Sequence, residues 1–293
     1  MNKTKRVHRS GKSLIRQMDK TCVPQDGIVV WHLGQAGVAV KTDEVICYFD
    51  PYLSDYVNTS GLAGLPGSWP RQFEPPLEPV QVANAGYVFI THDHLDHLDP
   101  VSVKGIDSAS PDVRFICPAP AVSILRELGI AEKRIIPARA GVPLNEAGMD
   151  IMPIACKHEE YLVDENGDHA YLGYVVQSNG VTFYHAGDTI LHRELIETLR
   201  TFSIDAAFMP INGGDFMRLD KGIVGNMGFR EAADLAHLLQ VDLVIPIHYD
   251  LFHFNADNPA YFVDYVYRNY PGQCFKMMVP GERMVYLAEN DEE

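Results

Sequence analysis

Short apolar segments, each bounded by Gly, Pro, Asn or Asp, recur along the chain and predict a succession of β-strands. These predicted strands cover residues 28–33, 38–40, 45–49, 87–90, 113–117, 150–155, 171–177, 181–184, 206–209 and 243–247. Longer segments with mixed apolar and polar positions predict helices over residues 12–20, 121–128, 191–200, 229–240 and 259–269. The proline at position 259 suits the first turn of the last of these helices.

The order of these elements favours an α/β fold. The first three strands have hairpin spacing, and later strands alternate with helices, which favours two sheets covered by helices in a four-layer αββα sandwich. We expect residues 1–26 to form a polar, basic N-terminal extension and residues 27–293 to form a single domain. The long loop over residues 54–80 is rich in Gly and Pro, and a loop of this length inside a domain is usually functional or disordered. Its aromatic side chains favour order.

Composition and charge exclude several classes of protein. With 293 residues, 46% of them hydrophobic, the chain can bury a large core. Its formal charge of −15 argues against a nucleic-acid partner, because such binding needs a basic face. The first twenty positions hold seven of the 24 basic residues and only one acidic residue, so this segment is a docking arm or simply a solvated terminus. No stretch approaches the ~20 apolar residues of a membrane span, and no signal peptide is evident. The five cysteines favour buried free thiols over disulfides. We therefore expect a cytoplasmic protein without a membrane partner.

The segment that follows the predicted strand 87–90 is dense in metal-binding side chains. It contains three histidines and two aspartates, namely His92, Asp93, His94, Asp96 and His97. In extended chain His92 and His94 point to the same side, and a helix beginning there would bring Asp96 and His97 round on its first turn. Imidazole and carboxylate suit Zn²⁺, Mn²⁺ or Fe²⁺. A polar turn is the alternative, but burying so many titratable groups without a metal would be costly.

This H-x-H-x-D-H run resembles the signature of the metallo-β-lactamase superfamily, and the resemblance implies a binuclear site in a four-layer sandwich. Further positions match the family's ligands in the same order along the chain, each where a predicted strand ends. The resemblance implies one metal held by His92, His94 and His158, a second held by Asp96, His97 and His248, and Asp188 bridging the two. Asp50 matches the buried aspartate that braces the histidine loop, and we expect Asp93 and His185 to support the ligands as well.

A narrower resemblance covers nearly the whole chain. Four motifs, at residues 31–37, 91–94, 184–189 and 245–252, look like those of the L-ascorbate-6-phosphate lactonase family. That family binds manganese or zinc, opens a sugar lactone and forms larger assemblies, so the resemblance implies two divalent ions of manganese or zinc and a homo-oligomer. Two departures, an earlier C-terminus and the presence of His158, favour the wider family over that particular substrate.

The resemblance implies a hydrolase in which a metal-bridging hydroxide attacks a sugar lactone or a sugar-phosphate lactone. Asp188 and Asp96 are the predicted catalytic carboxylates, with Asp188 as the proton shuttle. Asp250 is a second shuttle candidate, although a cap or turn role fits it as well. The alternatives are a phosphodiesterase of the same superfamily and a non-catalytic metal-binding protein.

We expect a small-molecule substrate, and an anionic one would need contacts that this acidic chain supplies sparingly. The candidates lie in the long loop and in loops after predicted strands, and they are Arg71, Asn212, Arg218, Tyr249 and Asp250. Lys221 is a further basic candidate in the same loop as Arg218. For each basic side chain, a solvated loop charge is the simpler alternative.

Overall fold

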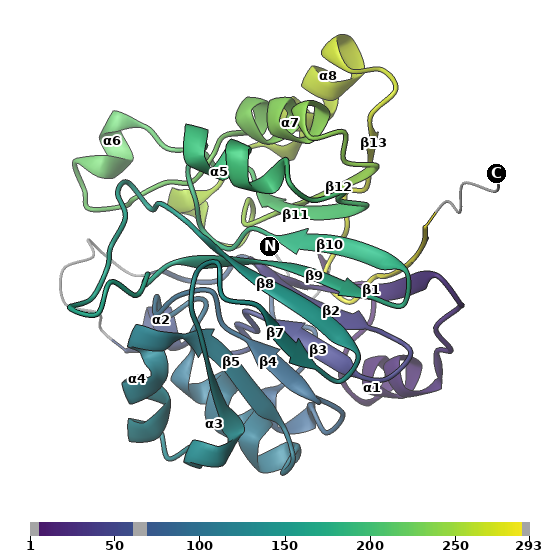
Figure 1. The fold of residues 1–293 in the computed structure, drawn as a ribbon, viewed down its shortest axis with the longest axis vertical. Helices are drawn as coiled ribbons and strands as arrows, with labels where there is room; N and C mark the ends of the chain where they lie inside the picture. Colours follow the sequence, from purple (N-terminus) through teal and green to yellow (C-terminus); the bar gives the residue numbers. More distant parts are fainter. Residues whose placement is uncertain (1–5, 61–68, 289–293) are drawn as a thin grey trace.

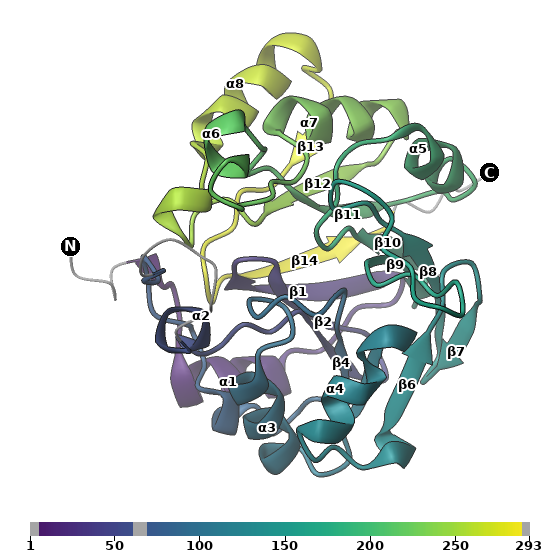
Figure 2. The same ribbon diagram turned by 90° about the vertical axis from the view of Figure 1, so that its left-hand side faces the viewer.

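The structure is a computed structural model that describes residues 6–60 and 69–288. Two seven-stranded sheets lie face to face, and helices cover the outer side of each, as Figures 1 and 2 show from two directions. These four layers confirm the α/β sandwich that the order of elements predicts.

The first sheet has the strand order β14-β1-β2-β3-β4-β5-β6. Its strands are β1 (Gly27–Gly34), β2 (Gly37–Lys41), β3 (Ile46–Phe49), β4 (Tyr87–Phe89), β5 (Arg114–Pro118), β6 (Ile135–Ala138) and β14 (Arg283–Leu287). Strands β14, β1, β2 and β3 pair antiparallel, and β3 to β6 pair parallel. The carboxyl ends of β3 and β4 therefore meet at one edge of the sandwich, where the site residues follow.

The second sheet repeats this division in the order β13-β12-β11-β10-β9-β8-β7. Its strands are β7 (Leu144–Glu146), β8 (Met149–Ala155), β9 (Leu172–Ser178), β10 (Val181–His185), β11 (Ala206–Pro210), β12 (Leu243–Ile247) and β13 (Cys274–Phe275). Strands β7 to β10 pair antiparallel, and β10 to β13 pair parallel. The ends of β10 and β12 thus carry the second set of site residues.

The helices pack on the outer faces through their apolar sides. On the first sheet lie α1 (Gly11–Lys20), α3 (Pro100–Ala109) and α4 (Val122–Glu127), and on the second lie α5 (Arg193–Leu199), α7 (Phe229–Leu238) and α8 (Pro259–Asn269). Short helices in the loops are α2 (Tyr56–Thr59), η2 (Pro79–Gln81), η3 (Ala119–Ala121), η4 (Glu132–Arg134), α6 (Phe216–Leu219) and η5 (His253–Asn255). No helix among the described residues is both long and apolar enough to span a membrane.

The core between the sheets is built from aromatic and branched side chains. Phe49 and Phe89 of the first sheet stack with ring centroids 4.3 Å apart, and Phe183 of the second sheet meets Phe49 edge-on at 5.7 Å. All three rings are at most 1% exposed. Burying such rings together strongly favours the docked arrangement of the two sheets, and this fixes the strand ends that carry the site.

The ten predicted strands and five predicted helices are all present within a few residues, whereas several short elements are additional. The unpredicted ones are β6, β7, β13, β14, α2, α3 and α6. Helix α3 has clear start signals, Asp99 as its cap and Pro100 in its first turn, but Gly105 interrupts its pattern. That glycine lets α3 approach η2 closely, since a Cβ there would lie 2.4 Å from Pro79. Most of the strands that sequence reasoning missed are short and have exposed positions, as β14 does.

Helix α1, which the sequence predicts from residue 12, is part of the packed structure. Leu14 and Met18 are fully buried under the first sheet, and the Trp31 indole donates a hydrogen bond to Gln17 at 3.1 Å. The boundary between extension and domain at residue 26 stays a prediction.

Candidate metal centre

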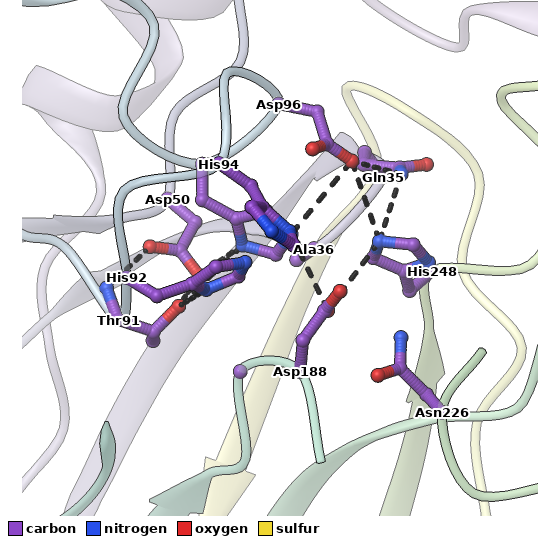
Figure 3. A network of polar contacts seen from close by, with 12 residues as sticks. Gln35, Ala36, Asp50, Thr91, His92, His94, Asp96, Asp188, Asn226 and His248 are labelled. Carbon is purple, nitrogen blue, oxygen red and sulfur yellow. Dashed lines mark hydrogen bonds and ion pairs between the residues drawn. The ribbon is translucent and has the colours of Figure 1, made fainter. Parts of the chain in front are cut away.

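Six polar side chains converge where strands of both sheets end. His92, His94, Asp96 and His97 follow β4, Asp188 follows β10, and His248 follows β12. We call these six the histidine–aspartate cluster, and Figure 3 shows Asp96, Asp188 and His248 directed toward one another. Carboxyl ends of neighbouring parallel strands are a common place for ligand sites, and here the two sheets supply such ends to one point.

The cluster contains two groups of candidate metal ligands. His92, His94 and Asp188 form one group, and the other consists of Asp96, His97 and His248. Within each group, the ligand atoms all lie within 4.8 Å of one another. Oδ1 of Asp188 is also 3.3 Å from His97 Nε2 and 3.4 Å from His248 Nε2, so this carboxylate lies between the groups.

The backbone after β4 differs from the expectation that a helix carries Asp96 and His97 on its first turn. Residues 94–98 form a tight turn, in which the amides of His97 and Leu98 both donate to the His94 carbonyl. Helix α3 begins only at Pro100, after Asp99 has capped it by accepting a hydrogen bond from the amide of residue 101. The prediction was wrong about the helix, although the turn presents Asp96 and His97 as predicted.

Asp50 holds His92 and His97 in place through hydrogen bonds. Its carboxylate accepts hydrogen bonds from the Thr91 amide at 2.9 Å, from the Thr91 hydroxyl at 2.7 Å and from His97 Nδ1 at 2.8 Å. The Thr91 oxygen is also 3.0 Å from His92 Nδ1. Because both Nδ1 atoms are engaged in this network, the Nε2 atoms of His92 and His97 face the cluster. Such partners fix the ring orientation of metal-binding histidines.

Sequence reasoning missed two residues that contact the cluster. The Gln35 amide donates to Asp96 Oδ2 at 2.7 Å and lies 2.9 Å from His248 Nε2. The Tyr171 hydroxyl lies 3.1 Å from His94 Nε2, and a hydrogen bond from that Nε2–H leaves Nδ1 with a lone pair. The motif at residues 31–37 could have indicated Gln35, whereas nothing local in the sequence marks Tyr171.

His185 and Gly187 set the position of Asp188. Nδ1 of His185 accepts a hydrogen bond from the Gly187 amide at 3.3 Å, and its Nε2 contacts the Ala36 carbonyl at 2.9 Å. Gly187 has a φ of +58°, and a Cβ there would lie 2.7 Å from Thr91 Cβ. Only glycine fits so close a turn. His185 thus supports the turn that carries Asp188, in the role the sequence predicts for it.

Burial and neighbouring charges adjust the protonation of the cluster. Burial raises the pKa of Asp188, but the His248 and His97 rings outweigh burial and hold that pKa well below its usual range. Burial lowers the pKa of His92 well below its usual value. In contrast, the carboxylates of Asp188 and Asp50 outweigh burial at His97 and raise its pKa. The site therefore holds ionised carboxylates that favour a cation among them.

Unpaired atoms show that the cluster fits metal ions. Buried His92 Nε2, His97 Nε2 and Asp188 Oδ1 have no hydrogen-bond partner among the described residues. Leaving His92 Nε2 buried without a partner costs about 1–3 kcal/mol, whereas His97 Nε2 and Asp188 Oδ1 lie 3.3 Å from each other without a hydrogen bond between them. Imidazole nitrogens and carboxylate oxygens are suitable donors for divalent transition metals. Two groups of three such donors fit a binuclear metal site.

His158 lies beside the first group but not within it. Its ring centroid is 5.2 Å from that of His94 and 6.1 Å from that of His92, and its Nδ1 is buried without a hydrogen-bond partner in the described part of the chain. Burial lowers the pKa of His158 to about 4, so the ring is neutral near pH 7. Its predicted role as a metal ligand stays a prediction.

A cavity of about 390 Å³ opens onto the cluster. Its lining includes the cluster residues His94, Asp96, Asp188 and His248, together with His158, Asp93 and Asn255. The remaining lining residues are Val57, Trp69, Leu95, Gly222, Ile223, Val224 and Phe252. We call the six apolar side chains Val57, Trp69, Leu95, Ile223, Val224 and Phe252 the apolar wall. Asp93 is exposed and lines this cavity, and its predicted role in supporting the ligands stays a prediction.

The two predicted arginine contacts do not line this cavity. Arg71 is 2% exposed, and its guanidinium donates to the carbonyls of Tyr52, Ser54 and Phe73. Arg218 pairs with Asp215 at 2.5 Å and donates to the carbonyl of Asn212. Both cations therefore hold loops, because their donors are directed at the protein itself.

Asn212 supports the cavity indirectly. Its buried side chain donates to Asn255 Oδ1 at 2.9 Å and accepts from Asn226 at 3.2 Å. Asn212 itself does not line the cavity, but its hydrogen bond helps to position Asn255, which does.

Tyr249 and Asp250 face elsewhere. Both line a second cavity of about 770 Å³ that shares no lining residue with the one above. His248 has a φ of +58°, and this left-handed backbone turns the chain directly after the ligand position. Tyr249 and Asp250 therefore do not line the cavity at the cluster, and their predicted roles stay predictions.

Comparison with known proteins supports this geometry. The sequence profile of the family described as "Beta-lactamase superfamily domain" matches residues 48–249. A UPF0173 metal-dependent hydrolase from Pyrobaculum arsenaticum is 33% identical over 212 residues, which are 70% of this chain and 84% of that protein. The probable L-ascorbate-6-phosphate lactonase UlaG of Escherichia coli is 24% identical over 277 residues, covering 84% of this chain and 77% of the relative.

Solved structures share the fold at low sequence identity. A possible metal-dependent hydrolase from Veillonella parvula superposes with a TM-score of 0.71 at 16% identity, over 89% of this chain and 99% of that one. The isothiocyanate hydrolase from Delia radicum gut bacteria superposes with a TM-score of 0.70 at 16% identity, over 89% of this chain and all of the other. At this identity the likeness concerns the fold alone.

Proposed function

The chain belongs to the metallo-β-lactamase superfamily and is a metal-dependent hydrolase, and from this premise we propose that it opens lactones. The substrate would be a small molecule whose ring ester is cleaved by water to give a hydroxy acid. The similarity to the probable L-ascorbate-6-phosphate lactonase over 84% of the chain supports this reaction.

The position of Asp188 carries the proposal. Its carboxylate is 4% exposed, lies between the two groups of ligands and lines the cavity. Manganese or zinc ions held by the cluster would supply Lewis acidity that lowers the pKa of water from 15.7 toward ~7 and polarises a carbonyl. An ionised carboxylate at this place can take a proton from the attacking water and pass it to the departing ring oxygen.

The remaining cluster residues supply ligands and order. Asp96 contributes a second carboxylate at the cavity edge, where Gln35 holds it by a hydrogen bond. Asp50 keeps the rings of His92 and His97 oriented through Thr91 and Nδ1. In this scheme, water adds to the ring carbonyl, the ring C–O bond breaks, and the proton from water ends on the new hydroxyl group.

A substrate panel with defined metal content tests the proposal. Chelator-treated protein would be reloaded with Mn²⁺ or Zn²⁺ and offered lactones, acyl esters and bis-p-nitrophenyl phosphate, with proton release and nitrophenolate absorbance as the readouts. We expect metal-dependent proton release from lactones, with little hydrolysis of the phosphodiester. Hydrolysis of the phosphodiester without any lactone turnover would overturn the proposal in favour of a phosphodiesterase.

A further inference from the structure

The cavity at the histidine–aspartate cluster has two chemically different sides. Ionisable groups of the cluster form one side, and the apolar wall forms the other. In the apolar wall, Trp69 and Ile223 are each 7% exposed and Phe252 is 3% exposed, so the wall presents only the edges of well-packed side chains. Binding cavities for small molecules commonly combine apolar walls with a few polar groups.

The apolar wall is preformed by packing. The Trp69 ring meets the Phe252 ring edge-on with centroids 5.4 Å apart, and the Tyr52 ring packs against Phe252 with centroids 5.9 Å apart. The backbone also joins the two loops, because the Gln72 amide donates to the Leu251 carbonyl at 2.9 Å. A surface held in this way can bind an apolar group without first paying the entropy of ordering its side chains.

Outside the metal-binding cluster, the described side chains of the cavity offer no positive charge to an anionic substrate. No lysine or arginine is among the described residues that line it, whereas three carboxylates are, namely Asp93, Asp96 and Asp188. Asp93 belongs to neither group of ligands, so its negative charge lies free at the cavity. Arg71 and Arg218 are engaged by loop carbonyls, and exposed Lys221 does not line the cavity.

From this juxtaposition we propose that the substrate is an uncharged lactone carrying an apolar substituent that packs against the apolar wall. This inference rests on the proposed lactonase function and narrows its substrate class. The ring ester lies at Asp188, and an aliphatic or aromatic substituent extends toward Trp69, Ile223 and Phe252. A phosphorylated sugar lactone is disfavoured, because with its ring ester at the metal-binding cluster the phosphate would meet Asp93 and find no lysine or arginine in the described lining.

The proposal predicts a dependence of turnover on chain length. Each methylene buried against an apolar surface favours binding about fourfold. We therefore expect kcat/KM to rise by about two- to fourfold per carbon from γ-butyrolactone to γ-octalactone and γ-decalactone, until the cavity is filled. 6-Phosphogluconolactone, used as the anionic probe, is expected to react at least tenfold less efficiently than γ-octalactone.

Two variants distinguish a contribution of the apolar wall to substrate choice from a contribution of the nearby Lys221. Ile223→Thr, which keeps the β-branch but makes this position of the wall smaller and polar, is expected to lower the ratio of kcat/KM for γ-decalactone to that for γ-butyrolactone about fivefold. Lys221→Gln is the matched control, and it should leave kcat/KM for every lactone within twofold of the wild type. A selective loss of 6-phosphogluconolactone turnover in Lys221→Gln would instead reveal anion recognition and overturn the proposal.

A binding measurement gives a readout that needs no turnover. The chain has two tryptophans, Trp31 in the core and Trp69 in the apolar wall. We expect 2-hexyltetrahydrofuran, which lacks the ester, to change the tryptophan fluorescence of the metal-loaded protein in a saturable way. The change should disappear in Trp69→Phe, while unsubstituted tetrahydrofuran should produce none at the same concentrations.

The outcomes distinguish the two proposals. Lactone turnover that is flat with chain length, or fastest for 6-phosphogluconolactone, would overturn the apolar substrate class and leave lactone hydrolysis standing. If no lactone is turned over at all, the proposed function fails, and the substrate class fails with it. The fluorescence titration then still decides whether the apolar wall binds apolar rings.

Discussion

The histidine–aspartate cluster and the apolar wall line one cavity but are held in opposite ways. Side chains of the cluster are fixed by directed hydrogen bonds that run to Asp50, Gln35, Thr91 and Tyr171. The apolar wall is fixed by ring packing such as that of Trp69 on Phe252, and part of it comes from loops. Hydrogen bonds specify position and orientation, whereas packing specifies shape and tolerates similar replacements. We therefore expect mutations to separate the proposed chemistry of the cluster from the proposed substrate choice of the apolar wall.

The sharpest way to break this comparison is to remove Asp188 from the cluster. Asp188→Ala is expected to lower kcat/KM by at least about a thousandfold, because the group of His92 and His94 loses its carboxylate ligand and the proposed proton carrier is removed with it. Metal content, measured by elemental analysis, should fall as well. Asp264→Ala removes a carboxylate on the surface of α8 and serves as control. Near-normal turnover in metal-depleted Asp188→Ala would contradict the role assigned to the cluster.

Replacing Asp50 tests the bracing network without touching a proposed ligand. Asp50 has a φ of +41°, a conformation that asparagine adopts readily, so Asp50→Asn should keep the backbone. It removes the charge that faces His97, and we expect metal affinity to drop by about 10–100-fold. Competition with a chromogenic chelator measures this loss. If excess metal fails to restore any of the lost turnover, Asp50 acts in some way other than through metal binding.

A change in the apolar wall should have a smaller effect of a different kind. Phe252→Leu keeps an apolar side chain but removes the ring that packs on Trp69. We expect KM for an alkyl-substituted lactone to rise about five- to tenfold while kcat stays within about threefold, as steady-state kinetics can show. An equal fall of kcat for all lactones would mean that the apolar wall and the cluster are not separable.

The last prediction concerns the stability of the fold and not turnover. It involves His32, a core histidine in β1 that lies outside the cluster. Burial lowers the pKa of His32 from 6.5 to about 4, although Glu282 opposes the shift. Between these pH values the unfolded chain binds a proton that the folded chain does not. The contribution of neutral His32 to the free energy of unfolding is therefore fully present above pH 6.5. It declines as the pH falls toward 4, because protonation favours the unfolded chain.

This pH dependence is expected to be weaker in His32→Gln, with a difference of at most about 3 kcal/mol between the two pH limits. Urea unfolding at pH 7.5 and pH 4.5, with wild type and variant in the same metal state, measures it. Contributions from the cluster cancel in this double difference. Parallel stability curves for the two proteins would show that His32 does not titrate as expected.

The sequence predicted the cluster well because its signal is local. His92, His94, Asp96 and His97 stand within six residues of one strand end, and Asp188 and His248 each follow a recognisable strand. The alternation of apolar and polar segments likewise predicted both sheets, since strands buried on both faces read as continuous apolar runs.

The apolar wall and the substrate contacts could not be read in this way. Whether Arg71 faces a substrate depends on the carbonyls of Tyr52 and Ser54, which approach it only in the folded chain. Tyr249 and Asp250 stand next to a ligand position, yet the left-handed turn at His248 sends them to the other cavity. The sequence shows which residues are charged and which are neighbours along the chain. Hydrogen-bond partners and the local direction of the backbone depend on tertiary structure.

The pairing of β1 with β14 has a consequence for synthesis of the protein. Strand β1 ends at residue 34 and its partner begins only at residue 283. At a translation rate of about 5–20 residues per second, on the order of ten to fifty seconds pass before the partner leaves the ribosome. Until then one hydrogen-bonding edge of β1 is open to other strands. An open edge of this kind can pair with strands of other chains, so the unfinished protein is exposed to aggregation until β14 completes the sheet.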